Sequence, residues 1–380
     1  MTDDGKRGNV IIVRSRATDH TVDKFAKSLS HDGYSVELLL WNRQKTPIEE
    51  KGEGYVRKLL RLEAPQDRGQ AVLFFPVWWI YEFFFLLRRN PDVVHAYDLD
   101  TLLPAICIKL LKKTRLFYSI GDFYANNLPE GFPRAVRNMI REFVGQVEKT
   151  LASFADTVFL VDETRREELG WARTGNVQII YNSPPDYSHV EKGKANGVRN
   201  QLTVFYAGVI SRQRGLLDMI KAVRNVNNVR LVVGGTGPDA KCIQETARGG
   251  KNVEYLGWLP SYEDVIRMTQ EADVLFRFSN PKIPKTRYES PNKLFEAMMC
   301  AKPIIVSDGS SMADIVRKEE CGIVVPYGDV NAIEGALRQL MENKKLRESL
   351  GRNGRHAYER RYSWTTMEGR LLKAYHDATA

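Results

Sequence analysis

The residues with the clearest chemical potential lie between positions 288 and 308, in the stretch YESPNKLFEAMMCAKPIIVSD. Ser290 followed by Pro291 is typical of a helix start, because serine caps free backbone amides and proline fits the first helical position. The free amides of Ser290, Asn292 and Lys293 would form an anion site at the positive end of the helix dipole, and the Lys293 ammonium adds a full charge. The stretch therefore predicts a site for an anionic group such as a phosphate.

Glu296 would add recognition of a sugar. It follows Asn292 by four residues, so the two side chains lie on the same face of the predicted helix. A carboxylate there would repel a phosphate, but it could accept hydrogen bonds from two ribose hydroxyls. Together these features predict a site for a nucleoside diphosphate. The alternative that stays open is an ordinary capped helix with a solvated Lys293 and Glu296.

The composition is that of a globular chain, with 43% hydrophobic and 27% charged residues among 380. At this length two domains are expected. The 56 Lys and Arg against 47 Asp and Glu give a formal net charge of +9, which suits an anionic substrate or a membrane surface. The basic residues are spread out and no aromatic-and-basic recognition motif stands out, so we do not expect nucleic acid as a partner.

Cysteine usage and the amino terminus indicate a reducing compartment. Cys107, Cys242, Cys300 and Cys321 are far apart, with no histidine in metal-ligand register beside them, which argues against a zinc site or a disulfide framework. The first residues, MTDDGKRGNV, lack the apolar core of a signal peptide. We therefore expect a cytoplasmic protein that carries no metal or other cofactor.

Apolar strands alternate with amphipathic helices along most of the chain. Val10–Val13, a helix and Ser35–Leu40 form one strand–helix–strand unit, and the pattern recurs as far as Val177–Tyr181. Residues 182–200 are rich in Pro, Gly, Asn and charge and indicate a linker. A second alternating series begins at Leu202–Tyr206. We expect an α/β fold with two doubly wound, Rossmann-like domains that face a cleft.

Several polar residues of the first half fall at or just beyond expected strand ends, where parallel sheets bind ligands. They are Arg14, Arg16, His95, Asp98 and Asp122. Asp98 and Asp100 raise the possibility of a metal-binding carboxylate pair. The position of Asp100-Thr101, directly before the apolar residues 102–111, favours a helix cap instead.

Residues 71–87, AVLFFPVWWIYEFFFLL, are the most apolar stretch of the chain. A membrane span takes about 20 apolar residues, and a proline and a glutamate interrupt this shorter run, so a span is the weakest interpretation. A buried core helix and a helix lying at a membrane interface both stay open. Trp78 and Trp79, the flanking basic residues and the arginines of residues 134–154 favour the interface. We therefore expect a possible peripheral membrane contact through residues 71–89, at the inner face of the membrane.

A loop with two candidate phosphate ligands follows the first strand of the second half. It runs over residues 208–215, GVISRQRG, and starts at Gly208. Arg212 or Arg214 in this loop could reach the phosphates expected at Lys293. The alternative is a solvated basic loop.

A second loop over residues 234–238, GGTGP, follows the next strand. Gly235 and Gly237 would let the backbone come close to a ligand. As a dinucleotide-binding fingerprint the loop is weak, because Pro238 interrupts the run into the helix and Gly-x-Gly-x-x-Gly is not completed.

These stretches together resemble the family-4 retaining glycosyltransferases of the GT-B fold, in the Ser-Pro-Asn-Lys subgroup, over nearly the whole chain. The matching pieces are Pro91–Asp100, Asn182–Asp186, Ala207–Gly215, Gly234–Pro238 and Ser290–Pro303. Tyr362-Ser363-Trp364 and the helix after it look like the family's closing segment, which crosses back onto the first domain. The resemblance implies an acceptor-binding domain over residues 1–190, a nucleotide-sugar-binding domain over 191–361, and a terminal helix over 362–380 that returns to the first domain.

The resemblance also implies roles for individual residues. By position, Lys293 would contact the diphosphate of the donor and Glu296 its ribose. Gly257-Trp258-Leu259 lies where the family's backbone meets the nucleobase.

This chain departs from the family's pattern at residues that bind phosphate or assist catalysis. The family's phosphate arginine falls on Val209 and its lysine on Arg214, with Arg212 as the candidate to compensate. The family's acceptor-domain histidine falls on Gly121, beside Asp122.

The expected activity is that of a hexosyltransferase that needs no metal. Lys293, Arg214 or Arg212 and the helix amides would stabilise the negative charge on the leaving diphosphate. Attack would come from the same face, with a donor phosphate oxygen helping to take the acceptor proton, and Asp122 would orient donor or acceptor. The acceptor is expected to be a glycan or a lipid-linked sugar. Three alternatives stay open: a metal-dependent transferase using the carboxylate pair above, a sugar-nucleotide epimerase, and a non-catalytic sugar-nucleotide-binding protein.

Overall fold

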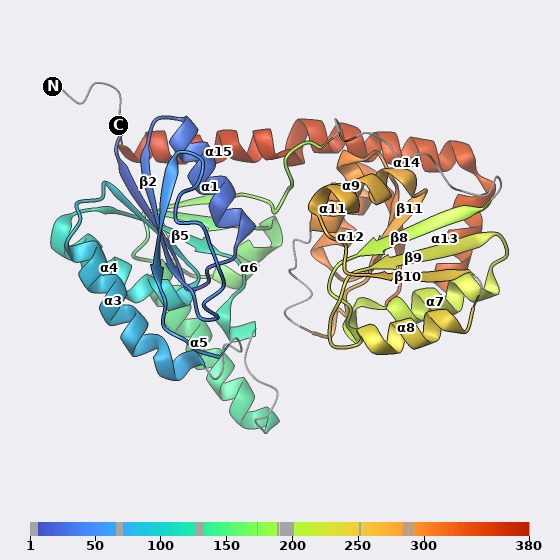
Figure 1. Cartoon of the computed structure of the whole chain (residues 1–380), viewed down its shortest axis with the longest axis horizontal. Coiled ribbons are helices and arrows are strands. Elements are labelled where there is room, and N and C mark those ends of the chain that lie inside the picture. Colours follow the sequence, from blue (N-terminus) through green and yellow to red (C-terminus); the bar gives the residue numbers. More distant parts are fainter. Residues whose placement is uncertain are drawn as a thin grey trace. The chain divides into compact units, whose positions relative to one another are not determined.

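The computed structural model describes residues 7–65, 71–126, 133–172, 174–187, 190, 201–250, 252–283, 288 and 292–379. The chain forms two compact units, each with its own parallel sheet (Figure 1). Unit 1 comprises Met1–Tyr181 and Met367–Ala380, and unit 2 comprises Asn182–Thr366. The expectation of two doubly wound α/β domains, with a carboxyl-terminal helix that returns to the first, is confirmed.

Unit 1 is built on a seven-stranded sheet in the order β3-β2-β1-β4-β5-β6-β7, with every neighbouring pair parallel. The strands are β1 (Asn9–Arg14), β2 (Ser35–Trp41), β3 (Tyr55–Leu60), β4 (Val93–Tyr97), β5 (Arg115–Ile120), β6 (Thr157–Leu160) and β7 (Asn176–Ile179). The central strands are continuous apolar runs because both faces of a parallel sheet are buried. The sequence analysis missed β3, an edge strand whose sequence, YVRKLL, includes two basic residues and lacks such a run.

The α-helices described in unit 1 are α1 (His20–His31), α3 (Phe75–Leu87), α4 (Leu102–Lys112), α5 (Arg134–Ala152), the short α6 (Arg166–Leu169) and most of α15 (Trp364–Thr379). Asp19 caps α1 by accepting a hydrogen bond from the Thr21 amide at 3.0 Å. Helix α3 packs against α4, and α4 packs against α5 (Figure 1).

The apolar stretch 71–87 is a core helix on one face and an exposed helix on the other. Phe75, Trp78 and Leu86 of α3 are buried, whereas other apolar residues of this stretch are exposed. Nε1 of Trp79 donates a hydrogen bond to the Asp100 carbonyl at 2.9 Å, so both tryptophans contact the protein. Among the described residues, none of the helices has the length and apolar character needed to span a bilayer.

Unit 2 is built on a six-stranded parallel sheet in the order β10-β9-β8-β11-β12-β13. Its strands are β8 (Leu202–Ala207), β9 (Val229–Gly234), β10 (Val253–Gly257), β11 (Val274–Arg277), β12 (Ile304–Ser307) and β13 (Gly322–Val325). Its helices are α7 (Leu216–Asn225), α8 (Ala240–Arg248), α9 (Tyr262–Glu271), α11 (Asn292–Met299), α12 (Ser311–Glu319), α13 (Val330–Glu342) and α14 (Lys344–Ala357).

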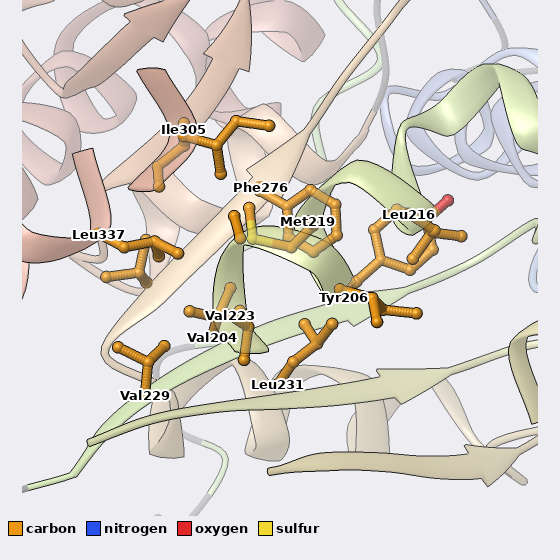
Figure 2. Packing of buried hydrophobic residues seen from close by; sticks show 14 of the residues in the cluster. Val204, Tyr206, Leu216, Met219, Val223, Val229, Leu231, Phe276, Ile305 and Leu337 are labelled. Carbon is orange, nitrogen blue, oxygen red and sulfur yellow. The ribbon is translucent and has the colours of Figure 1, made fainter. Parts of the chain in front are cut away.

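The core of unit 2 lies between one face of this sheet and helices α7 and α13 (Figure 2). Val204 and Tyr206 of β8 face inward together with Leu231 of β9. Met219 of α7 and Leu337 of α13 pack in the same buried cluster from the helix side. Because every second residue of β8 and β9 points into this layer, the strand ends and the loops after them are held in place.

The strand order of each sheet reverses once, and such a switch point is where doubly wound sheets bind ligands. In unit 2 the reversal falls between β8 and β11, and in unit 1 between β1 and β4. The loops that leave the carboxyl ends of these strands therefore define where a site is expected in each unit.

Candidate functional site

Lys293 lies in the first turn of α11, at the switch point of unit 2. Its side chain is half-buried, and Nζ lies 5.1 Å from the centroid of the Tyr206 ring on β8. Burial lowers the pKa of Lys293, and the Arg214 guanidinium lowers it further, while the Glu296 carboxylate acts in the opposite direction. Two cations thus lie near one another at the start of a helix, and an anion bound there would relieve their repulsion.

Gly208 and Lys293 come together although 85 positions separate them. A Cβ on Gly208 would lie 3.0 Å from Nζ of Lys293 and 3.2 Å from its Cε. Gly208 also has a φ of 145°, in the region that favours glycine. The loop after β8 and the helix α11 therefore meet at the lysine.

The glycines of the two loops make room for backbone. A Cβ on Gly235 would lie 2.0 Å from the carbonyl oxygen of Gly208, and one on Gly237 would lie 2.3 Å from that of Ile210. The Ile210 amide donates to the Thr236 carbonyl at 2.9 Å. The missing side chains thus let the two loops pack on each other, and close approach of Gly235 and Gly237 to a ligand stays a prediction.

Glu296 is 4% exposed and has a partner that the sequence did not suggest. The Tyr262 hydroxyl donates a hydrogen bond to Oε1 of Glu296 at 2.9 Å. Burial, and next the Glu296 carboxylate, raise the pKa of Tyr262. The Tyr187 ring packs edge-on against Tyr262, with centroids 5.4 Å apart. A ribose at Glu296 would share the carboxylate with this phenol.

The two arginines of the loop after β8 differ in their surroundings. Arg214 is close enough to Lys293 to lower the pKa of the lysine. The backbone amide of Arg212 donates to Asp239 at 2.8 Å and its Nε donates at 3.2 Å, while 78% of its side chain is exposed. The structure therefore groups Arg214 with Lys293 and pairs Arg212 with Asp239.

The residues expected near a nucleobase follow β10. Gly257 has a φ of 72°, and its carbonyl accepts a hydrogen bond from the Gly235 amide at 2.6 Å. The Trp258 side chain is 73% exposed, and Leu259 packs against Gly234, where a Cβ would come within 2.8 Å of Cδ1. Ser290, the expected cap of α11, lies outside the described residues.

The first-unit candidate, Asp122, lies just after β5 and is held by a buried arginine. Nη2 of Arg165 donates to Asp122 at 2.9 Å, and Nη1 donates to Glu168 at 3.1 Å. The Asp122 side chain is 33% exposed. A role for this carboxylate in orienting donor or acceptor stays a prediction.

Glu148 on α5 forms two hydrogen bonds that hold the residues on either side of Asp122. Its two oxygens accept hydrogen bonds from the Tyr118 hydroxyl and the Tyr124 amide, both at 2.9 Å. Burial raises the pKa of Glu148 to about 8. The sequence analysis missed this residue, because a glutamate on a predicted amphipathic helix carries no signal of burial.

The carboxylates after β4 do not cap a helix, so that expectation is wrong. Thr101 donates its hydroxyl to the carbonyls of Tyr97 and Asp98, and no side chain caps the start of α4. Asp98 instead pairs with Nη1 of Arg14 at 2.7 Å and accepts from the Gly121 amide at 3.0 Å.

Asp100 is likewise turned toward protein groups. It accepts a hydrogen bond from Ser15 and lies 3.7 Å from Nη2 of Arg43. In the part of the chain that the structure describes, no three His, Cys, Asp or Glu side chains converge in a way that could hold a metal ion.

His95 is not at a strand end, which corrects its grouping with the ligand-edge residues. It lies inside β4 and is completely buried. Its Nδ1 and Nε2 form hydrogen bonds of 2.7 Å with the hydroxyls of Tyr375 on α15 and Ser119 on β5. Burial lowers the pKa of His95 to about 3. His95 therefore anchors the returning helix α15 in unit 1.

The part of the chain that forms most of unit 2 is similar to a known protein family. Residues 190–357 match the family model described as glycosyl transferases group 1. This match supports the resemblance noted from the sequence at the level of the family over these residues, and the Ser-Pro-Asn-Lys subgroup stays a prediction.

Curated relatives of the chain are glycosyltransferases by name. The chain is 24% identical over 220 residues to the capsular polysaccharide biosynthesis glycosyltransferase CapM of Staphylococcus aureus, covering 55% of this chain and 56% of the relative. It is 29% identical over 207 residues to the phosphatidyl-myo-inositol mannosyltransferase of Mycobacterium leprae, covering 53% and 51%. The chain thus aligns with about half the length of these relatives.

Solved structures match over almost the whole chain. The sucrose-phosphate synthase from Thermosynechococcus elongatus has a TM-score of 0.78 at 16% identity, covering 97% of this chain and 98% of that one. Anabaena Alr3699/HepE in complex with UDP has a TM-score of 0.72 at 14% identity, covering 97% and 99%. At these identities the likeness concerns the fold.

Proposed function

We propose that this chain is a retaining hexosyltransferase that moves a sugar from a nucleotide-sugar donor to a glycan or lipid-linked acceptor without a metal ion. The observation that carries the proposal is the meeting of Lys293, Gly208 and Glu296 at the switch point of the unit that matches the group 1 glycosyl transferase model. The names of the relatives support it, since the Mycobacterium leprae protein is a mannosyltransferase and the Anabaena structure contains UDP.

In unit 2, the donor diphosphate would lie against Lys293, Arg214 and the first amides of α11. Breaking the bond between sugar and phosphate leaves negative charge on the diphosphate, and fixed cations in a partly dry site stabilise that charge. Burial and the Arg214 charge lower the pKa of Lys293 although Glu296 opposes them, and the diphosphate would add negative charge that favours the ammonium form. Glu296, held by Tyr262, would accept hydrogen bonds from the ribose.

In unit 1, the acceptor would lie near the strand ends that carry Asp122 and the Asp98–Arg14 pair. The acceptor hydroxyl would attack from the face that the diphosphate leaves, and a donor phosphate oxygen would take its proton. Asp122, fixed by Arg165, would orient the acceptor or the donor sugar. Retention of configuration follows from attack on the same face.

We also propose that unit 1 touches the inner face of a membrane through the exposed side of α3. Leu73, just before α3, and Val77, Ile80 and Phe84 of α3 recur at helical spacing and are 83%, 51%, 59% and 48% exposed. Leu110 of the adjacent α4 is 68% exposed and extends the same apolar surface. An exposed apolar helix face is costly in water and favours contact with lipid.

Basic residues next to this apolar surface suit anionic lipid headgroups. Arg88 follows α3 and is exposed, and Lys113 follows α4. A second amphipathic surface lies on α5, where Met139 and Phe143 are 67% and 69% exposed. Positive charge beside exposed apolar side chains is the pattern of a peripheral membrane surface. From this membrane surface, unit 1 would reach an acceptor that is linked to a lipid.

The proposed activity can be tested with the full chain in two steps. Thermal-shift screening against UDP-, GDP-, ADP- and TDP-sugars should identify one donor that raises the melting temperature. That donor, mixed with bacterial lipid and glycan acceptors in a chelator, should yield a glycosylated product with the donor's anomeric configuration. Loss of activity in chelator would favour a metal-dependent transferase. Donor conversion without acceptor would favour an epimerase, and binding without turnover a sensor.

A further inference from the structure

A pocket opens in unit 1 at the carboxyl ends of β1 and β2, beside the switch point of that sheet. Its volume is about 310 Å³. One wall is the loop after β1 and the other is the loop after β2. The lining residues are Arg16, Ala17, Thr18, Trp41, Asn42, Arg43, Gln44 and Thr46. A volume of this size is at the lower end of the range for small-molecule sites.

The lining of this pocket is polar and positively charged. Arg16 comes from one wall and Arg43 from the other, and none of the described lining residues is acidic. A second hollow of about 870 Å³ shares Asn42 and Thr46 with the pocket, so a ligand could extend beyond the two arginines. An arginine on each of two walls supplies positive charge that is suited to an oxyanion with several oxygens.

The wall that carries Arg43 is held rigid. Cζ of Arg43 lies 4.3 Å from the centroid of the Trp41 ring and 5.8 Å from that of Phe75. Oδ1 of Asn42 accepts from the Thr46 amide at 3.0 Å, and Nδ2 donates to the Thr46 carbonyl at 2.7 Å. A ligand would therefore meet a preformed wall, which lowers the entropy cost of binding.

The buried layer next to this wall contains two carboxyl groups, those of Asp100 and Glu82. Asp100 lies 3.7 Å from Arg43 and also accepts a hydrogen bond from Ser15. Glu82 is completely buried, and neither of its carboxyl oxygens has a hydrogen-bond partner among the described residues. Burial, with the Asp100 charge as a second cause, raises the pKa of Glu82 well above its usual value. The raised pKa favours the neutral form of Glu82, which adds no negative charge beside Arg43.

We infer that this pocket binds a phosphate group of the acceptor, between Arg16 and Arg43. The inference rests on the proposed function for the identity of the ligand as an acceptor. The donor phosphates belong to the Lys293 site in unit 2, so the pocket in unit 1 is a second phosphate site. Both a lipid diphosphate and a water-soluble sugar phosphate present this chemistry.

Calorimetric titration of the full chain with pyrophosphate tests the site itself. The Lys293→Ala variant serves as the starting protein, because it weakens pyrophosphate binding in unit 2. Adding Arg16→Gln should weaken the remaining binding about tenfold or more, the usual worth of a charge-assisted hydrogen bond. Arg115→Gln is the matched control, since Arg115 is exposed and lies at the amino-terminal end of β5, whereas the pocket lies at the carboxyl ends of the strands.

Two results would overturn the inference. One is the absence of pyrophosphate binding in Lys293→Ala, and the other is an equal loss in the Arg16→Gln and Arg115→Gln variants. Competition then separates the two sources: displacement of pyrophosphate by a short-chain prenyl diphosphate supports a lipid-linked acceptor, and displacement by a hexose 6-phosphate supports a sugar phosphate. If neither compound displaces pyrophosphate, the assignment to an acceptor is wrong.

This outcome is separable from that of the proposed function. If Arg16→Gln slows transfer to phosphate-bearing and phosphate-free acceptors equally, the phosphate site is refuted while the transferase stands. If the chain binds no nucleotide sugar yet binds pyrophosphate in an Arg16-dependent way, the transferase fails, and the pocket remains a phosphate site with another ligand.

Discussion

A Cβ on Gly208 would lie 3.0 Å from Nζ of Lys293. The two residues come from the loop after β8 and from the first turn of α11, which the strand order brings together at the switch point of unit 2. The ammonium group thus occupies the space that any other residue at position 208 would fill. The position of the Lys293 ammonium therefore depends on Gly208, which has no side chain that could take part in the reaction.

Gly208→Ala should therefore weaken binding of the nucleotide-sugar donor. The methyl group would displace the Lys293 side chain, and alanine at a φ of 145° adds backbone strain. We expect a loss of donor affinity of about tenfold, equivalent to about 1.4 kcal/mol, measured by calorimetry. Gly335→Ala on α13 is the control, since nothing lies within 4 Å of its Cβ position. Wild-type affinity in Gly208→Ala would show that the lysine needs no space there.

The pair formed by Tyr262 and Glu296 gives a second prediction. If the carboxylate binds the ribose, Glu296→Gln should raise KM for the donor about tenfold or more, because it removes a charged acceptor. Tyr262→Phe should raise KM less, since it removes only the group that positions Oε1. Glu334→Gln on α13, where the glutamate pairs with Arg338, is the control. Steady-state kinetics in which Tyr262→Phe is the more damaging change would contradict a ribose-binding role for Glu296.

Glu148 should make the stability of unit 1 fall as pH rises. Its pKa is about 8 in the folded chain and about 4.5 when unfolded, so the folded state holds a proton that the unfolded state has released between these values. The stabilisation is complete below pH about 4.5 and is lost as pH rises through about 8. We expect the free energy of unfolding to fall by up to about 1.4 kcal/mol per pH unit in this window.

Urea unfolding of unit 1 at several pH values between about 6.5 and 8 checks this dependence. The ordinary pKa of histidine is about 6.5, so the buried His95 contributes an opposing slope that fades as pH rises through this window and is the same in every variant. Glu148→Gln should flatten the dependence, whereas Glu142→Gln, on the exposed face of the same helix, should preserve it. An unchanged slope in Glu148→Gln would mean that the carboxyl is ionised in the folded chain.

Membrane contact predicts that the exposed side of α3 is needed for binding to vesicles. The full chain should float with liposomes that contain anionic lipid, and Ile80→Ser combined with Phe84→Ser should reduce the bound fraction severalfold. Both side chains are about half exposed, so their replacement should leave stability within about 0.5 kcal/mol. Leu256→Ser, at a partly exposed leucine of unit 2, is the control. Equal flotation of all three proteins would rule out this surface.

Much of the fold was predictable because buried parallel strands are continuous apolar runs. Ile304-Ile305-Val306 is one such run, and it forms β12, which pairs with β11 on one side and β13 on the other. The edge strand β3 escaped because its residues are mostly half-buried. The helix 71–87 was ambiguous in the sequence, since its core face and its exposed face are equally apolar and only tertiary packing distinguishes them.

The candidate site was predictable where neighbours in the chain suffice, as for Lys293 and Glu296 on one helix. It was not predictable where partners are distant in the sequence. Tyr262 reaches Glu296 from another helix, and Arg165 reaches Asp122 from beyond the next strand. No local pattern marks either contact.

The most direct test of the central claim is the affinity of Lys293→Ala for the nucleotide sugar that stabilises the wild-type chain. Calorimetric titration should show a loss of 10- to 150-fold, the range expected when a charge-assisted hydrogen bond of about 1.5–3 kcal/mol is removed. Lys241→Ala, at an exposed lysine of α8, should bind the donor as the wild type does. Wild-type affinity in Lys293→Ala would contradict the account, because the donor diphosphate would then bind elsewhere.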